Sequence, residues 1–238
     1  MAMKKNFVKG MRHGVPIMLG YLSVSFGFGV LCIQNNLSIL AAVGISVTNL
    51  TSAGQVAGVG VIAAGGSLIE MILCQLVINL RYSLMSLSLS QKLDSSFNLM
   101  HRLFVGFGVT DEIFAVASAQ PEPLSPSYMY GLILTPFIGW STGTLLGAVA
   151  GDIMPASVTA ALSLMLYGMF IAIIIPPAKK NLRVLFVILL SAAVSVVIHY
   201  FLPMISGGFT VIIAALISSV AAAIFFPVKD ENRGEGSA

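Results

Sequence analysis

Long apolar runs, broken by short polar stretches, dominate the 238-residue chain. Six of these runs have about the ~20 residues that a helix needs to cross the hydrocarbon core of a membrane. They cover residues 15–33, 67–90, 128–150, 156–175, 184–202 and 208–226. The pattern predicts an all-α polytopic membrane protein with about six full transmembrane helices.

Two further apolar segments are irregular. Residues 37–66 form two half-length pieces around a polar stretch at 51–55, and residues 103–117 form a shorter apolar segment with Asp111 and Glu112 inside it. Such interruptions are typical of broken or re-entrant helices, which line the binding sites of many transporters. We therefore predict two broken or re-entrant elements beside the full spans. If each half-length piece spans instead, the count rises to seven or eight.

The distribution of Lys and Arg predicts the orientation. Basic residues lie in residues 1–14, in the loops 92–102 and 179–183, and in the tail 228–238. Because cytoplasmic loops are rich in Lys and Arg, both termini are expected in the cytoplasm. On this orientation the segment 103–117 enters and leaves the membrane on the same side. Residues 15–227 then form a single transmembrane domain between a basic N-terminus and a tail whose last five residues could derive from cloning.

Composition excludes several classes of protein. Only 9% of the residues are charged and 57% are hydrophobic, against roughly 25% charged residues in soluble domains. Cys32 and Cys74 lie inside apolar runs with no C-x-x-C or Cys/His pairing, so neither a disulfide nor a metal site is predicted. No H-E-x-x-H or G-x-S-x-G motif occurs. We expect no enzyme activity, no cofactor and no nucleic-acid partner.

Ionisable side chains inside membrane segments are candidate functional groups, because each costs roughly 2.5–3.5 kcal/mol on insertion scales. Asp111, Glu112 and Glu70 are candidates for proton coupling or for binding a substrate ammonium group. Adjacent helical positions diverge, so only one of Asp111 and Glu112 is expected to face the pathway. The structural alternative is that Asp111 caps a helix while Glu112 pairs with Arg81 or Arg102.

The polar stretch 51–55 is a candidate substrate site. Exposed N–H groups at a half-helix N-terminus bind carboxylates, which suggests a role for Ser52, Ala53, Gly54 and Gln55. The alternative is close helix packing through a small-x-x-x-small pair at Gly54 and Gly58.

Asn79 and Arg81 are further candidate substrate ligands. For Arg81 the alternative is an internal ion pair or a clamp on backbone carbonyls. A break in their helix would help both side chains reach a polar interior, because they differ by about 200° around a continuous helix.

Three motifs together resemble those of the AzlC family. They are Thr-Ser-Ala-Gly-Gln at 51–55, Ile-Asn-Leu-Arg-Tyr-Ser-Leu at 78–84 and Thr-Asp-Glu-Ile-Phe-Ala at 110–115. The resemblance covers roughly residues 11–117. It implies the large subunit of an exporter of valine, leucine, isoleucine or their analogues, usually with a small AzlD-type membrane subunit. Many members have His where Tyr82 stands here, so a protonatable role at that position is not carried over.

The sequence thus favours a secondary transporter that exports branched-chain amino acids across the bacterial cytoplasmic membrane, coupled to the proton gradient. A channel-like pore for a small solute and a non-catalytic membrane subunit of a larger complex remain as alternatives. Saturable counterflow distinguishes a carrier from a channel.

Overall fold

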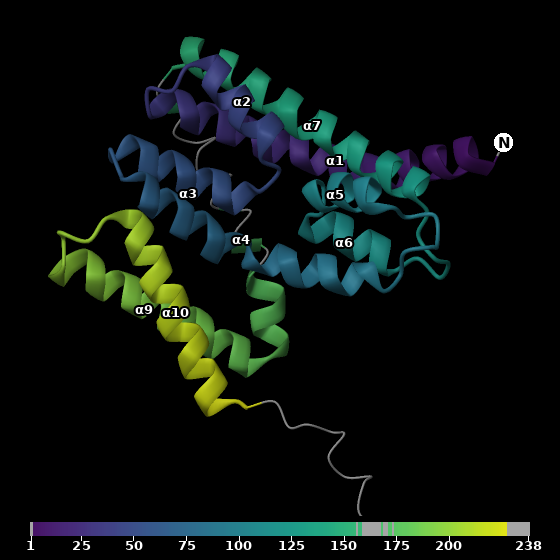
Figure 1. Cartoon of the computed structure of the whole chain (residues 1–238). Helices are drawn as coiled ribbons and strands as arrows, with labels where there is room; N and C mark the ends of the chain where they lie inside the picture. The colour runs from purple at the N-terminus through teal and green to yellow at the C-terminus, as the bar shows by residue number, and fades with distance from the viewer. Residues whose placement is uncertain (1, 156, 159–167, 169–170, 173, 228–238) are drawn as a thin grey trace, which may run out of the picture.

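Helices account for the architecture of the described part of the chain, which comprises residues 2–155, 157–158, 168, 171–172 and 174–227 of a computed structural model. No β-strand occurs among these residues. The helices, shown in Figure 1, are α1 (Ala2–Gln34), α2 (Ile39–Thr48), α3 (Ser52–Ala63), α4 (Leu68–Ser90), α5 (Leu99–Phe107), α6 (Asp111–Ser118), α7 (Pro126–Ile153), α9 (Leu182–Phe201) and α10 (Gly207–Phe225). The predicted all-α polytopic class is confirmed.

Five described helices are long and apolar enough to cross a membrane: α1, α4, α7, α9 and α10. They match five of the six predicted spans. The sixth, 156–175, lies largely outside the described residues, as does the tail 228–238. Helix α1 begins at Ala2, so the basic N-terminal stretch continues the first span. Its 33 residues reach about 50 Å, which is longer than a hydrocarbon core of about 30 Å.

Helices α1 and α7 lie side by side and run in the same direction (Figure 1). Small residues allow this close approach. A Cβ atom built on Gly139 of α7 would lie 2.7 Å from the carbonyl oxygen of Met18 on α1. Further along both helices, Gly143 packs against the backbone of Leu22 in the same way. The pair forms the backbone of the fold, onto which the shorter helices pack.

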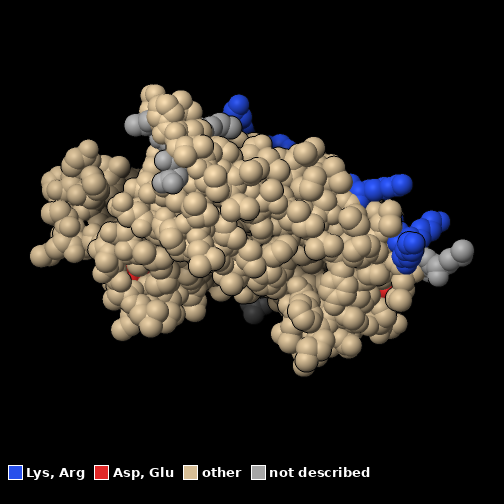
Figure 2. Space-filling view, turned by 90° about the horizontal axis from the view of Figure 1, so that it is seen from above, with Lys and Arg blue, Asp and Glu red and all other residues tan. Residues whose placement is uncertain are grey.

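Helix α4 runs in the opposite direction to α1. Lys92, two residues beyond the end of α4, donates hydrogen bonds to the carbonyl oxygens of Ser118 and Gln120. Ser125, which lies in the loop that follows Gln120, accepts a hydrogen bond from Asn6 of α1. The end of α4, the start of α1 and the start of α7 therefore share one end of the bundle, which we call the N-terminal end. Basic side chains gather mainly at this end (Figure 2).

Helices α5 and α6 form a hairpin that enters from the N-terminal end and returns to it. Helix α5 follows the loop after α4, and α6 ends at Ser118 beside Lys92. The predicted re-entrant course of residues 103–117 is thus borne out by the geometry. This second hairpin turns at residues 108–110, its tip.

Helices α2 and α3 form the first hairpin, which enters from the opposite end. Ser46 of α2 bonds Thr144 near the far end of α7, and Val59 of returning α3 packs with Phe28 and Ala148. Its tip, residues 49–51, meets the second hairpin near the middle of the bundle (Figure 1). The half-length pieces therefore turn back rather than span. The chain builds two consecutive units of opposite orientation, α1 to α3 and α4 to α6, each a long helix followed by a hairpin.

Candidate functional site

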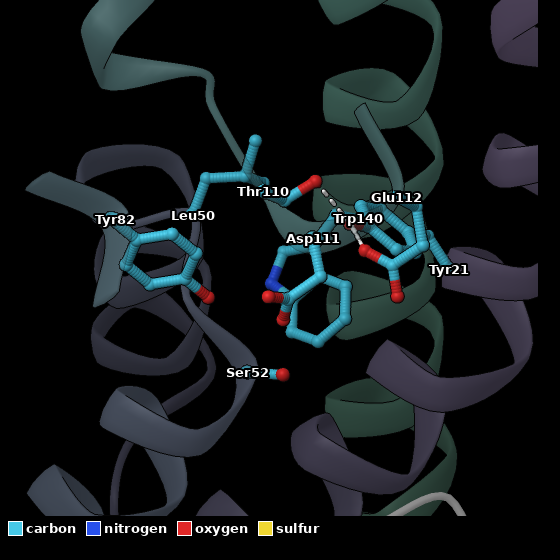
Figure 3. Close-up of a pocket in the computed structure, with 8 residues that line it drawn as sticks. All are labelled: Tyr21, Leu50, Ser52, Tyr82, Thr110, Asp111, Glu112 and Trp140. Carbon is cyan, nitrogen blue, oxygen red and sulfur yellow. Dashed lines mark hydrogen bonds between the residues drawn. The ribbon is translucent and has the colours of Figure 1, made fainter. Parts of the chain in front are cut away.

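A small pocket lies where the two hairpin tips meet, between α1, α4 and α7 (Figure 3). Its cavity measures about 10 Å³, room for about one water molecule. Eight residues line it: Tyr21, Leu50, Ser52, Tyr82, Thr110, Asp111, Glu112 and Trp140. The first turns of α3 and α6 both point their N-termini at this space. A solute larger than water requires the tips to part.

Thr110 starts α6 by capping it. Its side-chain oxygen accepts from the backbone N–H of Ile113, at 3.4 Å. The Tyr21 hydroxyl lies 2.7 Å from Thr110 Oγ1 and 2.5 Å from Glu112 Oε2, and both oxygens are acceptors for it. A hydroxyl carries one proton, so Tyr21 donates to one of these two oxygens at a time. Tyr21 therefore ties α1 to the tip of the second hairpin.

Asp111 forms an ion pair with Arg81 of α4, with 2.8 Å between Asp111 Oδ2 and Arg81 Nη1. The side chains are 37% and 40% exposed, respectively. Arg81 Nη2 also donates to the Tyr82 hydroxyl at 3.1 Å, and the guanidinium lies 4.9 Å from the centre of the Tyr82 ring. Neither side chain is fully buried, so the ion pair remains open to exchange with another partner.

Neutral amides hold the tip of the first hairpin. The Thr51 hydroxyl donates to Asn79 Oδ1 of α4 at 2.8 Å, and Asn79 Nδ2 donates to Gln75 Oε1 at 3.0 Å. Gln75 Nε2 in turn donates to the carbonyl oxygen of Gly54 at 2.7 Å. This series of hydrogen bonds fixes the first turn of α3 against α4.

Gln55 is fully engaged in the same tip. It is 1% exposed. Its Oε1 accepts from Trp140 Nε1 at 3.0 Å, and its Nε2 donates to the carbonyl oxygens of Ile45 and Asn49. A buried amide with every bond satisfied is costly to disturb, so Gln55 anchors the tip to α7.

The structure separates the candidate substrate ligands into two groups. Ser52 lines the pocket. Ala53 and Gly54 lie on α3 outside the lining, and Gln55 and Asn79 hold the first tip in place. A Cβ atom built on Gly54 would lie 2.6 Å from Gln75 Oε1, so the close-packing interpretation of this glycine applies.

Several local expectations are wrong. Thr110, rather than Asp111, caps α6. Asp111 and Glu112 both line the pocket, because the turn at the helix start splays them to either side. Helix α4 is unbroken at Asn79 and Arg81, which reach different hairpins from different faces. Arg81 pairs with Asp111, whereas Glu112 bonds Tyr21.

Glu70 lies away from this pocket, in the first turn of α4. It is 3% exposed, accepts from the backbone N–H of Gly208 at 3.1 Å and bonds the Ser206 hydroxyl. A carboxylate at a helix N-terminus is stabilised by the free N–H groups and by the helix dipole. Glu70 therefore joins α4 to the start of α10.

Three lining residues were not singled out from the sequence: Tyr21, Leu50 and Trp140. Tyr21 and Trp140 carry a signal that could have identified them. Each places a hydrogen-bonding group inside an otherwise apolar span, where a partner is needed. Leu50 gives no such signal. Among the described residues, no cluster of three or more His, Cys, Asp or Glu could hold a metal ion.

Comparison with known proteins shows the family to which the chain belongs. Residues 16–154, which carry both hairpins and the whole pocket, match the family described as AzlC protein. The chain belongs to the AzlC family. This is a membrane protein family with a transport-related role.

Similar proteins include an uncharacterised membrane protein of Archaeoglobus fulgidus, 31% identical over 73% of this chain and 76% of that one. The inner membrane protein YgaZ of Escherichia coli is 29% identical over 71% of this chain and 72% of its own length. An uncharacterised membrane protein of Helicobacter pylori is 28% identical over 62% of this chain and 65% of that one. No solved structure matches the chain.

Proposed function

We propose that this AzlC-family protein is a secondary transporter that exports branched-chain amino acids, with the substrate held between the two hairpin tips. The observation that carries the proposal is the opposite chemistry of these tips. The first turn of α3 contains no acidic residue, whereas that of α6 contains Asp111 and Glu112. A zwitterion needs one site for an anion and one for a cation.

The carboxylate end is assigned to α3. The backbone N–H groups of Ser52 and Ala53 donate no hydrogen bond to any described residue, as is usual in the first turn of a helix. Free N–H groups and the helix dipole favour a carboxylate there. The Ser52 hydroxyl, at the pocket wall, adds a further donor.

The ammonium end is assigned to Asp111 and Glu112, and the aliphatic side chain to the apolar surfaces of Leu50 and the Trp140 ring. Burying such a side chain contributes about 1.5–3 kcal/mol, which favours leucine, isoleucine and valine over small amino acids. One of the two carboxylates also serves as the proton site that couples export to the proton gradient. Glu70 is the less favoured proton site, because it is engaged by α10.

Two inverted units around one site support a carrier that exposes the site alternately to the two sides. The small volume of the pocket, about 10 Å³, disfavours a permanently open pore. The basic N-terminal end is assigned to the cytoplasm, and the protein to the bacterial cytoplasmic membrane with both termini inside. We also propose a small AzlD-type membrane subunit as its partner.

Reconstitution tests the proposal. Purified protein in liposomes, with and without a small co-encoded membrane protein, is supplied with labelled leucine or valine. Saturable uptake into vesicles preloaded with unlabelled leucine supports it. A conductance far above the turnover of carriers would favour a channel instead, and no flux with any partner would favour a scaffolding subunit.

A further inference from the structure

The two hairpin tips are held in equivalent ways. Each half-helix begins with a capping threonine, Thr51 for α3 and Thr110 for α6. Each threonine hydroxyl contacts the long helix of the other unit: Thr110 contacts Tyr21 of α1 at 2.7 Å, and Thr51 contacts Asn79 of α4 at 2.8 Å. The long helix of each unit thus holds the hairpin tip of the other unit at the pocket.

The equivalence ends at the next residue. Ser52 follows the cap of α3 and has no charged partner, whereas Asp111 follows the cap of α6 and forms the ion pair with Arg81. Arg81 is absent from the pocket lining, while Asp111 is part of it. The cation that pairs with Asp111 is thus supplied by a residue that does not line the pocket.

Arg81 has further contacts besides the one with Asp111. Its guanidinium lies over the Tyr82 ring and bonds the Tyr82 hydroxyl, and these contacts do not require Asp111. An arginine over an aromatic face is stabilised by cation–π attraction. Tyr82 therefore still holds the guanidinium when the ion pair with Asp111 is broken.

We propose that Arg81 is a positioning residue that occupies the cation site on Asp111 while the pocket is empty and leaves it when a ligand ammonium group arrives. This inference rests on the proposed function and changes the role of Arg81 from candidate substrate ligand to stand-in for the substrate amine. Departure of Arg81 frees the first turn of α6 from α4. Ligand binding and release of the second tip thereby become one event.

Two compounds that each resemble one half of leucine distinguish a carboxylate ligand from a stand-in for the amine. 3-Methylbutylamine carries the amine without the carboxylate, and 4-methylpentanoate carries the carboxylate without the amine. Competition against labelled leucine is measured in Arg81→Gln and in Arg102→Gln. Arg102 is an exposed arginine on α5 outside the pocket and serves as the matched control.

The stand-in role predicts that Arg81→Gln binds the amine roughly two- to fivefold more tightly, because the ligand no longer displaces an ion pair. Binding of the carboxylate probe stays unchanged in this variant, and Arg102→Gln leaves both unchanged. Weaker binding of the carboxylate probe to Arg81→Gln, with binding of the amine unaltered, overturns the inference.

A second measurement uses the unaltered protein and needs no variant to fold. Phenylglyoxal modifies accessible arginines, and mass spectrometry reports the extent at each. The amine probe is expected to raise labelling at Arg81 and leave Arg102 unchanged. Protection of Arg81, or no effect, overturns the inference even if leucine is transported. Raised labelling without any leucine transport would contradict the proposed function and leave the stand-in role supported.

Discussion

Gly54 supports the first hairpin tip, and a valine in its place should weaken substrate binding strongly without unfolding the protein. A Cβ atom at this position would lie 2.6 Å from Gln75 Oε1, 2.8 Å from Thr51 Cγ2 and 3.1 Å from Asn79 Nδ2. All three are side-chain atoms rather than backbone atoms, so they move aside rather than block folding. Their movement breaks the bonds that hold the first turn of α3 against α4.

The size of the effect follows from the bonds that are lost. Displacing Gln75 removes its 2.7 Å bond to the Gly54 carbonyl, and displacing Asn79 removes its 2.8 Å bond from Thr51. At about 1 kcal/mol each, the binding-competent arrangement becomes about 2 kcal/mol less favourable. Apparent leucine affinity should fall roughly 30-fold. Helix propensity slightly stabilises α3 in this variant, because valine is a better helix former than glycine.

Gly60→Val provides the matched control. Gly60 lies on the same helix, and a Cβ atom built there has nothing within 4 Å. Binding of labelled leucine is measured by scintillation proximity in detergent, with size-exclusion profile and Tm as checks of integrity. Wild-type affinity in Gly54→Val, or an equal loss in Gly60→Val, would refute the role given to the tip.

Three further predictions address other contacts. Glu70→Gln should lower the free energy of unfolding by about 1–2 kcal/mol, because a charged acceptor at the start of α10 becomes neutral, and should leave leucine affinity unchanged in the same binding assay. Cysteines replacing Ser46 and Thr144, whose oxygens lie 2.7 Å apart, should form a disulfide that stops transport when oxidised and restores it when reduced; equal rates in both states would contradict alternating access. In Asp111→Asn and Glu112→Gln, loss of proton-driven flux with leucine exchange intact marks the proton site, and full driven flux in both variants would exclude this pair.

The fold was largely predictable from hydrophobic patterning. The spans were recognised by the length of their apolar runs. The first hairpin was recognised by the polar interruption at 51–55 and the second by the short, irregular apolar segment 103–117, because a broken apolar run cannot cross lipid unaided. The orientation of the second hairpin followed from the basic loops around it. The meeting of the two tips depends on the packing of α1 and α7, and the hydrophobic pattern does not show which spans are neighbours.

The pocket was predictable only in part. Asp111, Glu112 and Ser52 were found because charge or polarity inside a membrane segment is costly. Gln55 and Asn79 gave the same signal, yet their bonds are used within the protein, since sequence does not distinguish a polar group that meets a ligand from one that meets a backbone carbonyl. The pairing of Arg81 with Asp111 rather than Glu112 depends on which face of α6 meets α4, which spacing along the chain does not reveal.

Counterflow of leucine tests the central claim most directly. Liposomes containing the purified protein, with and without the proposed small AzlD-type subunit as the partner, are preloaded with unlabelled leucine and diluted into labelled leucine. A binding site alternately exposed to the two sides predicts saturable uptake that transiently exceeds equilibrium and is absent from vesicles without leucine inside. Flux that never saturates, or no uptake with or without the partner, would contradict a branched-chain amino acid carrier built around the two hairpin tips.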